Sequence, residues 1–71
     1  MRPQDFELDI MPLSEDEGGG FAAIAPELPG CRSDGETPED ALRNGYDAIA
    51  CWIEAAREMG RPIPEPKRLA A

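Results

Sequence analysis

The segment TPEDALRNGYDAIACWIEAAREMG, residues 37–60, carries the strongest structural signal in this 71-residue chain. Thr37 is a favourable N-cap, Pro38 suits the first helical position, and acidic residues follow in the first turn. Asp40 stands where a capping box would place an acceptor. The glycine that ends the segment suits the position just after a helix. The segment therefore predicts a helix from Pro38 to about Met59.

The predicted helix has one apolar face. At helical spacing this face carries Leu42, Ile49, Trp52, Ile53 and Ala56. Two small residues, Gly45 and Ala48, would let the helix backbone approach a sheet closely. We expect Trp52 and Ile53 to be buried in the core or in an interface between copies of the chain. For Trp52, a contact with another protein is the alternative.

Two segments before the helix predict a β-hairpin. In residues 5–12, Phe6, Leu8 and Ile10 alternate with acidic residues, which is typical of a half-buried strand. Residues 21–25 predict a second strand, in which Phe21 and Ile24 are expected core or interface residues. The polar, glycine-rich residues between the strands predict the turn, since glycine permits the positive φ that chain reversal often requires.

The remaining segments predict a short strand and an extended exit from the helix. Residues 31–34 follow a proline-rich break and are a candidate third strand. Residues 61–66 alternate proline with other residues, which excludes a helix or a central strand. A proline-rich ligand for a recognition domain is an alternative for this segment.

Together these segments predict an α+β fold. We expect a three-stranded antiparallel sheet with one long helix packed on one face, in the order ββ-β-α. Residues 1–66 would form this single domain, and residues 67–71 would form a short C-terminal tail.

Composition excludes several classes of function. The chain has 15 acidic and 7 basic residues, a formal net charge of −8 and no histidine. The negative charge disfavours direct nucleic-acid binding, which gains from Lys and Arg contacts with phosphates. The lack of histidine removes histidine-based catalysis and metal ligation. No apolar leader follows Met1 and no apolar run approaches the roughly 20 residues of a membrane span, so we expect a cytoplasmic protein.

Small size predicts self-association. Ordering 71 residues costs on the order of 100 kcal/mol, at about 1.5 kcal/mol per residue, and burial in so short a chain barely offsets this. Oligomerisation or binding to a partner protein is therefore expected, and for self-association we predict a homodimer or higher homo-oligomer. Cys31 and Cys51 are interpreted as reduced, small hydrophobic residues, with a disulfide or a metal site as the alternatives.

The acidic residues are unevenly distributed. Eleven of the 15 lie in residues 1–40. Acidic surfaces steer basic partners electrostatically. The candidates for contacting a basic partner, chosen because they cluster beside flexible turns, are Glu15, Asp16, Glu17 and Glu36. The alternative is that these residues only keep a small domain soluble.

Four blocks follow one another along the chain: Gly18–Phe21 with Ala25–Cys31, Gly35–Ala41, the helical set Asn44, Ala48, Ile49, Trp52 and Ile53, and Gly60–Pro66. In this order they resemble the N-terminal domain of the HicB family of antitoxins. Together they cover roughly residues 6–66. The resemblance implies a partial RNase H-like fold that is often completed by a last strand and by dimerisation.

The same resemblance implies a function. Family members neutralise HicA, a small basic RNA-cleaving toxin, by covering its active site, as type II toxin–antitoxin pairs do. Many also carry a C-terminal DNA-binding domain, which would have to follow the proline-rich exit. This chain ends five residues after Pro66, so we expect no direct operator binding. The alternative function is an orphan HicB-fold homo-oligomer, an interaction or regulatory module without a toxin.

An RNase H-like fold also raises the hypothesis of a metal-dependent nuclease, which needs several carboxylates converging on two ions. Asp5, Glu7 and Asp9 share a strand face, but alternation turns them toward water, opposite the apolar residues. Residues 15–17 lie on a turn that lacks the spacing of a calcium loop. We therefore predict no enzyme and no catalytic, metal or cofactor-binding residues.

Overall fold

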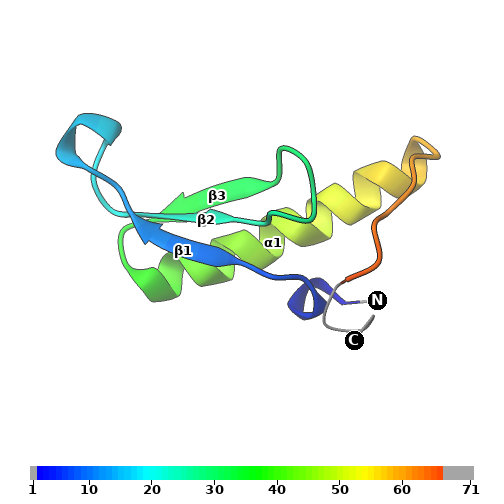
Figure 1. The fold of residues 1–71 in the computed structure, drawn as a ribbon, viewed down its shortest axis with the longest axis horizontal. Helices are drawn as coiled ribbons and strands as arrows, with labels where there is room; N and C mark the ends of the chain where they lie inside the picture. Colours follow the sequence, from blue (N-terminus) through cyan, green and yellow to red (C-terminus); the bar gives the residue numbers. More distant parts are fainter. Residues whose placement is uncertain (1, 67–71) are drawn as a thin grey trace.

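The computed structural model describes residues 2–66. The elements follow in the order η1 (Pro3–Asp5), β1 (Asp9–Pro12), η2 (Glu15–Glu17), β2 (Phe21–Ile24), β3 (Arg32–Gly35) and α1 (Pro38–Glu58), where η marks a single 3-10 turn. The strands form an antiparallel sheet in the order β1-β2-β3. The long helix α1 packs along one face of this sheet (Figure 1). The predicted α+β fold is confirmed.

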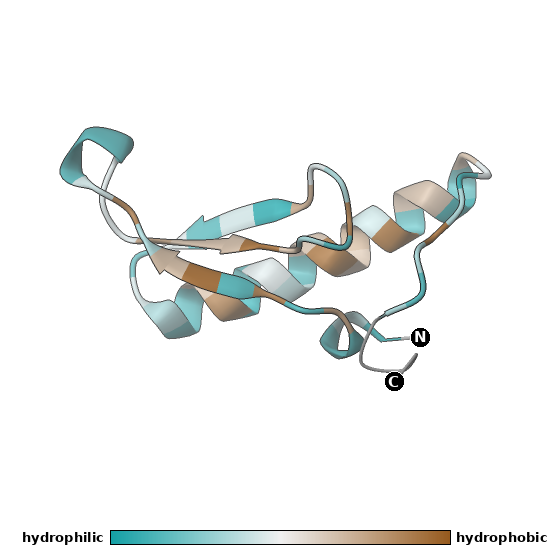
Figure 2. Ribbon diagram, in the orientation of Figure 1, coloured by the Kyte–Doolittle hydropathy of each residue, from teal (hydrophilic) through white to brown (hydrophobic). Residues whose placement is uncertain are grey.

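The core lies between the sheet and α1. Its buried residues form one cluster of Phe6, Ala25, Leu28, Cys31, Ile49 and Ile53. Small residues allow the helix to approach β2 closely, because a Cβ at Gly45 would lie 2.9 Å from the Cβ of Ala23. Figure 2 shows the apolar residues gathered where the strands meet the helix, whereas the turn between β1 and β2 is hydrophilic.

The buried stripe of α1 differs from the prediction at one position. The helix buries Ala41, Gly45, Ile49, Ile53 and Ala56, which are spaced four or three residues apart. Trp52 is half-buried beside this stripe, but Leu42 is 39% exposed. The prediction for Leu42 is therefore wrong. The small residues Ala41 and Gly45 occupy the contact with the sheet, and Leu42 is turned to the side.

The first strand is shorter than predicted. Strand pairing begins at Asp9, and residues 3–5 form the turn η1, which is held by a 2.9 Å hydrogen bond from the Arg2 N–H to the Asp5 carboxylate. Phe6 still enters the core and is 0% exposed, and Leu8 packs against the core cluster. The half-buried pattern thus holds for Phe6 and Leu8 only, because all four residues of β1 are exposed, including Ile10 at 36%.

Both ends of α1 are capped by local interactions. The hydroxyl oxygen of Thr37 accepts a 3.1 Å hydrogen bond from the Asp40 N–H, as the N-cap prediction requires. The Asp40 carboxylate pairs with Arg43 at 2.6 Å. At the other end Gly60 has φ +68°, and the Arg61 N–H donates to the Ala56 carbonyl at 2.8 Å, which is a Schellman motif.

The proline-rich exit turns back along the molecule. Residues 61–66 have no regular secondary structure and run from the C-terminal end of α1 toward the N-terminus (Figure 1). Ile63 packs against the core cluster, and Pro66 is fully buried. The predicted tail, residues 67–71, lies outside the described residues.

Candidate functional site: an acidic hollow beside the hairpin turn

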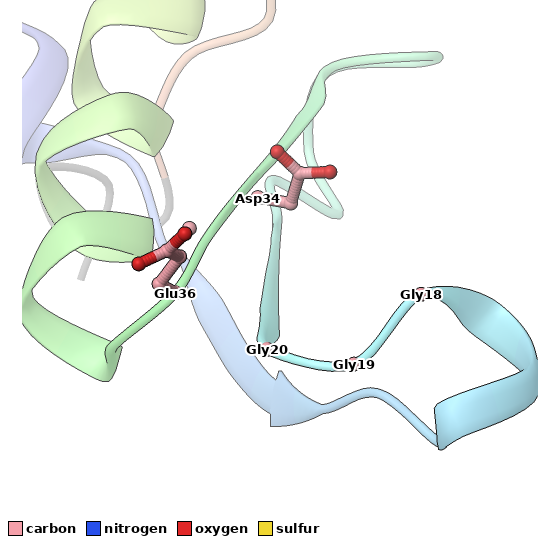
Figure 3. Close-up of a pocket in the computed structure, with 6 residues that line it drawn as sticks. Gly18, Gly19, Gly20, Asp34 and Glu36 are labelled. Atoms are coloured by element: carbon pink, nitrogen blue, oxygen red, sulfur yellow. The ribbon is translucent and has the colours of Figure 1, made fainter.

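A hollow of about 270 Å³ lies where the β1–β2 turn meets the end of β3. Its lining consists of Gly18, Gly19, Gly20, Asp34, Gly35 and Glu36, and we call it the acidic hollow. Figure 3 shows the glycine turn on one side and the side chains of Asp34 and Glu36 along the other. The two carboxylates lie apart and do not point at one another (Figure 3). This arrangement presents separate negative charges rather than a chelating pair.

Antiparallel pairing places the predicted acidic residues at one end of the sheet. Phe21, which follows the glycine turn, pairs with Gly35 at the end of β3. Glu36 therefore lies beside the turn that carries Glu15, Asp16 and Glu17, although some twenty residues separate them in sequence. All four predicted residues are exposed. Their binding role stays a prediction.

Glycine is required where the turn meets β3. Gly18, Gly19 and Gly20 have φ values of +102°, +71° and +75°, in the region that L side chains rarely adopt. A Cβ at Gly20 would also lie 2.6 Å from the carbonyl oxygen of Gly35. The three consecutive glycines thus let the turn close onto β3 and line one side of the hollow.

Glu17 has a structural role that its neighbours lack. One of its carboxylate oxygens accepts hydrogen bonds from the backbone N–H and the hydroxyl of Ser14, at 3.2 and 2.9 Å. These two bonds hold the pKa of the Glu17 carboxyl below its ordinary value, with a smaller contribution from the positive charge of Arg32. Glu17 therefore holds the turn together, while Glu15 and Asp16 project from it.

Asp34 is a residue of the hollow that the sequence prediction missed. It pairs with Ala22 in the sheet and is exposed, and its backbone carbonyl accepts a 2.9 Å hydrogen bond from the Asn44 side chain. The sequence contained one signal for it, because a third strand pairing with the second would place Asp34 close to the glycine turn. Only the register of β2 with β3 in the structure shows that Asp34 lines the hollow.

The residues predicted for the core or an interface divide into two kinds. Ile53 is buried in the core at 6% exposure, whereas Phe21, Ile24 and Trp52 are half-buried. The indole N–H of Trp52 donates a 3.0 Å hydrogen bond to the Pro29 carbonyl, which ties α1 to the loop between β2 and β3. Their role in an interface between copies stays a prediction.

The cysteines differ in environment. Both are free thiols, so the disulfide alternative does not apply in this structure. Cys31 belongs to the core cluster, and its burial raises the pKa of its thiol. Cys51 is exposed on α1. The interpretation as a small hydrophobic residue is confirmed for Cys31 and is wrong for Cys51, because position 51 faces away from the sheet.

The described part of the chain shows neither a metal cluster nor a membrane span. Within residues 2–66, no group of three or more acidic or cysteine side chains is arranged to hold a metal ion. No helix in the same range combines the length and apolarity needed to cross a bilayer.

The hydrogen bonds of Glu17 predict a specific pH dependence. Because folding lowers the Glu17 pKa, its ionised form stabilises the folded state above the ordinary carboxyl value of 4.5, and this stabilisation is lost as the pH falls through the lowered value. Glu17→Gln is expected to unfold at lower denaturant concentration than the wild type at pH 7, and the difference should disappear in acid. Denaturation followed by circular dichroism across the pH range measures it.

Glu15→Gln is the matched control, because it removes the same charge from the same turn without touching the Ser14 hydrogen bonds. If both variants show the same pH dependence, overall charge rather than the Ser14 contacts governs the stability of the turn.

The sheet, the long helix α1 and the exposed carboxylates define a small acidic α+β domain. Its residues 10–71 match the family described as the HicB-like antitoxin of bacterial toxin–antitoxin systems. The chain belongs to this family, as the resemblance of the four sequence blocks predicted.

Relatives from distant organisms are consistent with this assignment. The chain is 38% identical over 53 residues to UPF0150 protein ssr1765 of Synechocystis, covering 75% of this chain and 67% of the relative. It is 36% identical over 52 residues to UPF0150 protein Ta0767 of Thermoplasma acidophilum, covering 73% and 75%. A 14.9 kDa protein of Haemophilus phage HP1 is 35% identical over 46 residues, which span 65% of this chain but 35% of the phage protein. No solved structure matches the chain significantly.

Proposed function

We propose that this protein is a type II antitoxin that neutralises a small, basic, HicA-type RNA-cleaving toxin by binding over it. Membership of an antitoxin family implies a toxin partner. The observation that supports the binding mode is the acidic end of the domain, where the exposed Asp34 and Glu36 line a hollow against the glycines of the β1–β2 turn, the turn that also carries exposed acidic residues. On this proposal the protein acts stoichiometrically in the cytoplasm and has no catalytic residues.

The charges around the hollow are available to a partner. Within residues 2–66 the ion pairs are Arg2–Asp5, with 3.7 Å between the charged atoms, and Arg43–Asp40, at 2.6 Å. Neither involves Glu15, Asp16, Asp34 or Glu36. A basic surface that approached this end of the sheet would gain attraction without first breaking internal pairs, and such complementarity raises the association rate and selects the partner.

Charge reversal in the β1–β2 turn and at the acidic hollow tests the proposal. The triple variant Glu15→Lys, Asp16→Lys, Glu36→Lys should fold, because all three side chains are exposed. It is expected to bind the small basic protein encoded beside it at least tenfold more weakly than the wild type, and to lose the rescue of growth on co-expression. Glu17 is left unchanged because it supports the turn.

The control is Asp47→Lys, Glu54→Lys, Glu58→Lys on the exposed side of α1, which changes the net charge equally. It is expected to keep both binding and rescue. Binding is measured at about 0.15 M salt, at which interactions between surface charges are screened beyond about 8 Å. If the wild type forms no complex under these conditions, the antitoxin proposal fails. If both triple variants lose binding equally, the acidic end of the sheet is not the contact.

A further inference from the structure

A groove lies beside Trp52, where the C-terminal end of α1 meets the proline-rich exit. It consists of two hollows. The larger has a volume of about 350 Å³ and is lined by Pro29, Trp52, Arg61, Pro62 and Pro64. The smaller, of about 180 Å³, is lined by Trp52, Ala55, Ala56, Met59 and Arg61. The two hollows share Trp52 and Arg61 and therefore adjoin, and together we call them the Trp52 groove.

The Trp52 groove lies away from the acidic hollow. The β1–β2 turn and the C-terminal end of α1 stand at opposite ends of the molecule (Figure 1). Among residues 2–66, no residue lines both sites. A peptide held in the groove would therefore leave the acidic end of the domain free.

The walls of the groove are held in place before any ligand binds. The indole N–H of Trp52 donates to the Pro29 carbonyl at 3.0 Å, which fixes the ring against the loop between β2 and β3. The exit segment is anchored by Ile63, which packs against the core cluster, and by the 2.8 Å hydrogen bond from the Arg61 N–H to the Ala56 carbonyl. Because these contacts already order the surface, binding a ligand costs it little conformational entropy.

The groove combines apolar walls with one positive charge. Apart from Arg61, every residue that lines it is apolar. Arg61 is exposed, and the ion pairs of the described residues, Arg2–Asp5 and Arg43–Asp40, do not include it. Its guanidinium would repel a basic segment and would pair with a carboxylate. Charge complementarity therefore favours an acidic ligand at this site.

We propose that the Trp52 groove binds an extended acidic segment of a partner protein, in which an aromatic and an aliphatic residue stand two positions apart. Such side chains point to the same side of an extended chain, about 7 Å apart, so they can enter two adjoining hollows. The larger hollow, with its indole and three prolines, suits the aromatic ring, and the smaller one beside Met59 suits the aliphatic side chain. Glutamates next to these residues pair with Arg61, which borders both hollows.

A second copy of this chain does not present such a segment. Within residues 2–66, the exposed large apolar side chains are Ile10, Met11, Leu42 and Met59, none of which is aromatic. Phe6 has acidic neighbours, but its side chain is 0% exposed. The occupant is therefore a different protein.

Peptide titration tests the proposal, because Trp52 is the only tryptophan of the chain and its fluorescence reports directly on the groove. The probe is the peptide acetyl-Gly-Ser-Phe-Glu-Leu-Glu-Ser-Gly-amide, added to the full chain at about 0.15 M salt. A saturable change in emission is expected with a Kd of about 0.1–1 mM, since the contact is small. Glutamine in place of both glutamates is expected to weaken binding about threefold, the size of effect that an exposed ion pair gives.

Arg61→Gln identifies the group that recognises the carboxylates. This variant is expected to bind the glutamate and glutamine peptides equally. Arg57→Gln is the matched control, because it makes the same charge change on α1 without lining the groove, and it should keep the preference for glutamate. Both side chains are exposed, so both variants should fold, and circular dichroism checks this.

Four results would each overturn the proposal. The first is no saturable change in emission up to about 5 mM peptide. The second is tighter binding of the neutral peptide acetyl-Gly-Pro-Pro-Leu-Pro-Pro-Gly-amide, which would make the groove a site for proline-rich segments. The third is equal or tighter binding of the probe with lysine in place of both glutamates. The fourth is the same loss of glutamate preference in Arg57→Gln as in Arg61→Gln.

Discussion

Replacing Gly35 with alanine is expected to destabilise the protein by about 3 kcal/mol, at the upper end of what overpacking usually costs. For a domain of this size that loss lowers the Tm by roughly 12–24 °C. Thermal and denaturant unfolding, followed by circular dichroism, measure both quantities. Since a chain of this length is stable by roughly 4–10 kcal/mol, the variant would keep roughly a quarter to 70% of its stability.

The reason lies in how β3 passes under the start of α1. A Cβ at Gly35 would stand directly against the backbone nitrogen of Ala41, 2.7 Å from the carbonyl carbon of Asp40 and 2.8 Å from its Cβ. These atoms belong to the first turn of the helix, which the Thr37 cap holds in place. Relief of the clash would require the turn to shift as a unit, and this would weaken both the cap and the contact of the helix with the sheet.

Gly60→Ala is the matched control. Gly60 also ends a structural element, but nothing lies within 4 Å of a Cβ placed on it. Because φ at Gly60 is +68°, alanine at this position is expected to lower the free energy of unfolding by about 1–2 kcal/mol through backbone strain alone. If Gly35→Ala costs no more than Gly60→Ala, close packing of the helix against β3 is not what stabilises this junction.

Local signals explain why most of the fold could be predicted from the sequence. The capping residue Thr37 and the glycine at position 60 act on the nearest backbone groups, so their effect does not depend on the rest of the chain. Alternation in residues 5–12 similarly indicated that Phe6 and Leu8 would face the core. The capping signals and the alternation could therefore be interpreted without knowing which residues of the fold contact them.

Features that depend on tertiary contacts could not be predicted in the same way. Helical periodicity alone favoured Leu42 as a core residue. The buried stripe of α1 instead runs through Ala41 and Gly45, whose small size lets the helix approach the sheet closely. Asp34 joins the acidic hollow only through the register of β2 with β3. The sequence could identify Glu15, Asp16, Glu17 and Glu36 as exposed acidic residues. That Glu36 shares a hollow with the glycines of the β1–β2 turn follows from strand pairing.

The N-terminal segment is predicted to stabilise the domain even though the family match begins at residue 10. Phe6 is 0% exposed and lies in the core cluster with Ile49 and Ile53 of α1. Its N–H donates to the Pro3 carbonyl at 3.2 Å, and the turn η1 that contains Pro3 packs on α1. Phe6 thus joins the start of the chain to the middle of the helix.

Phe6→Ala is therefore expected to cost about 3–5 kcal/mol, the loss found when a fully buried phenylalanine leaves a cavity. Urea denaturation at neutral pH measures it, and the slope of the transition shows whether the variant still unfolds in one step.

Phe21→Ala is the control, because it removes the same side chain from β2, where that side chain is only half-buried. We expect it to cost roughly 2 kcal/mol, since less apolar surface returns to water. Equal losses for the two variants would mean that the N-terminal segment contributes no more to the core than the partly exposed strand residue does, and a negligible loss for Phe6→Ala would show that residues before β1 are not part of the stable fold.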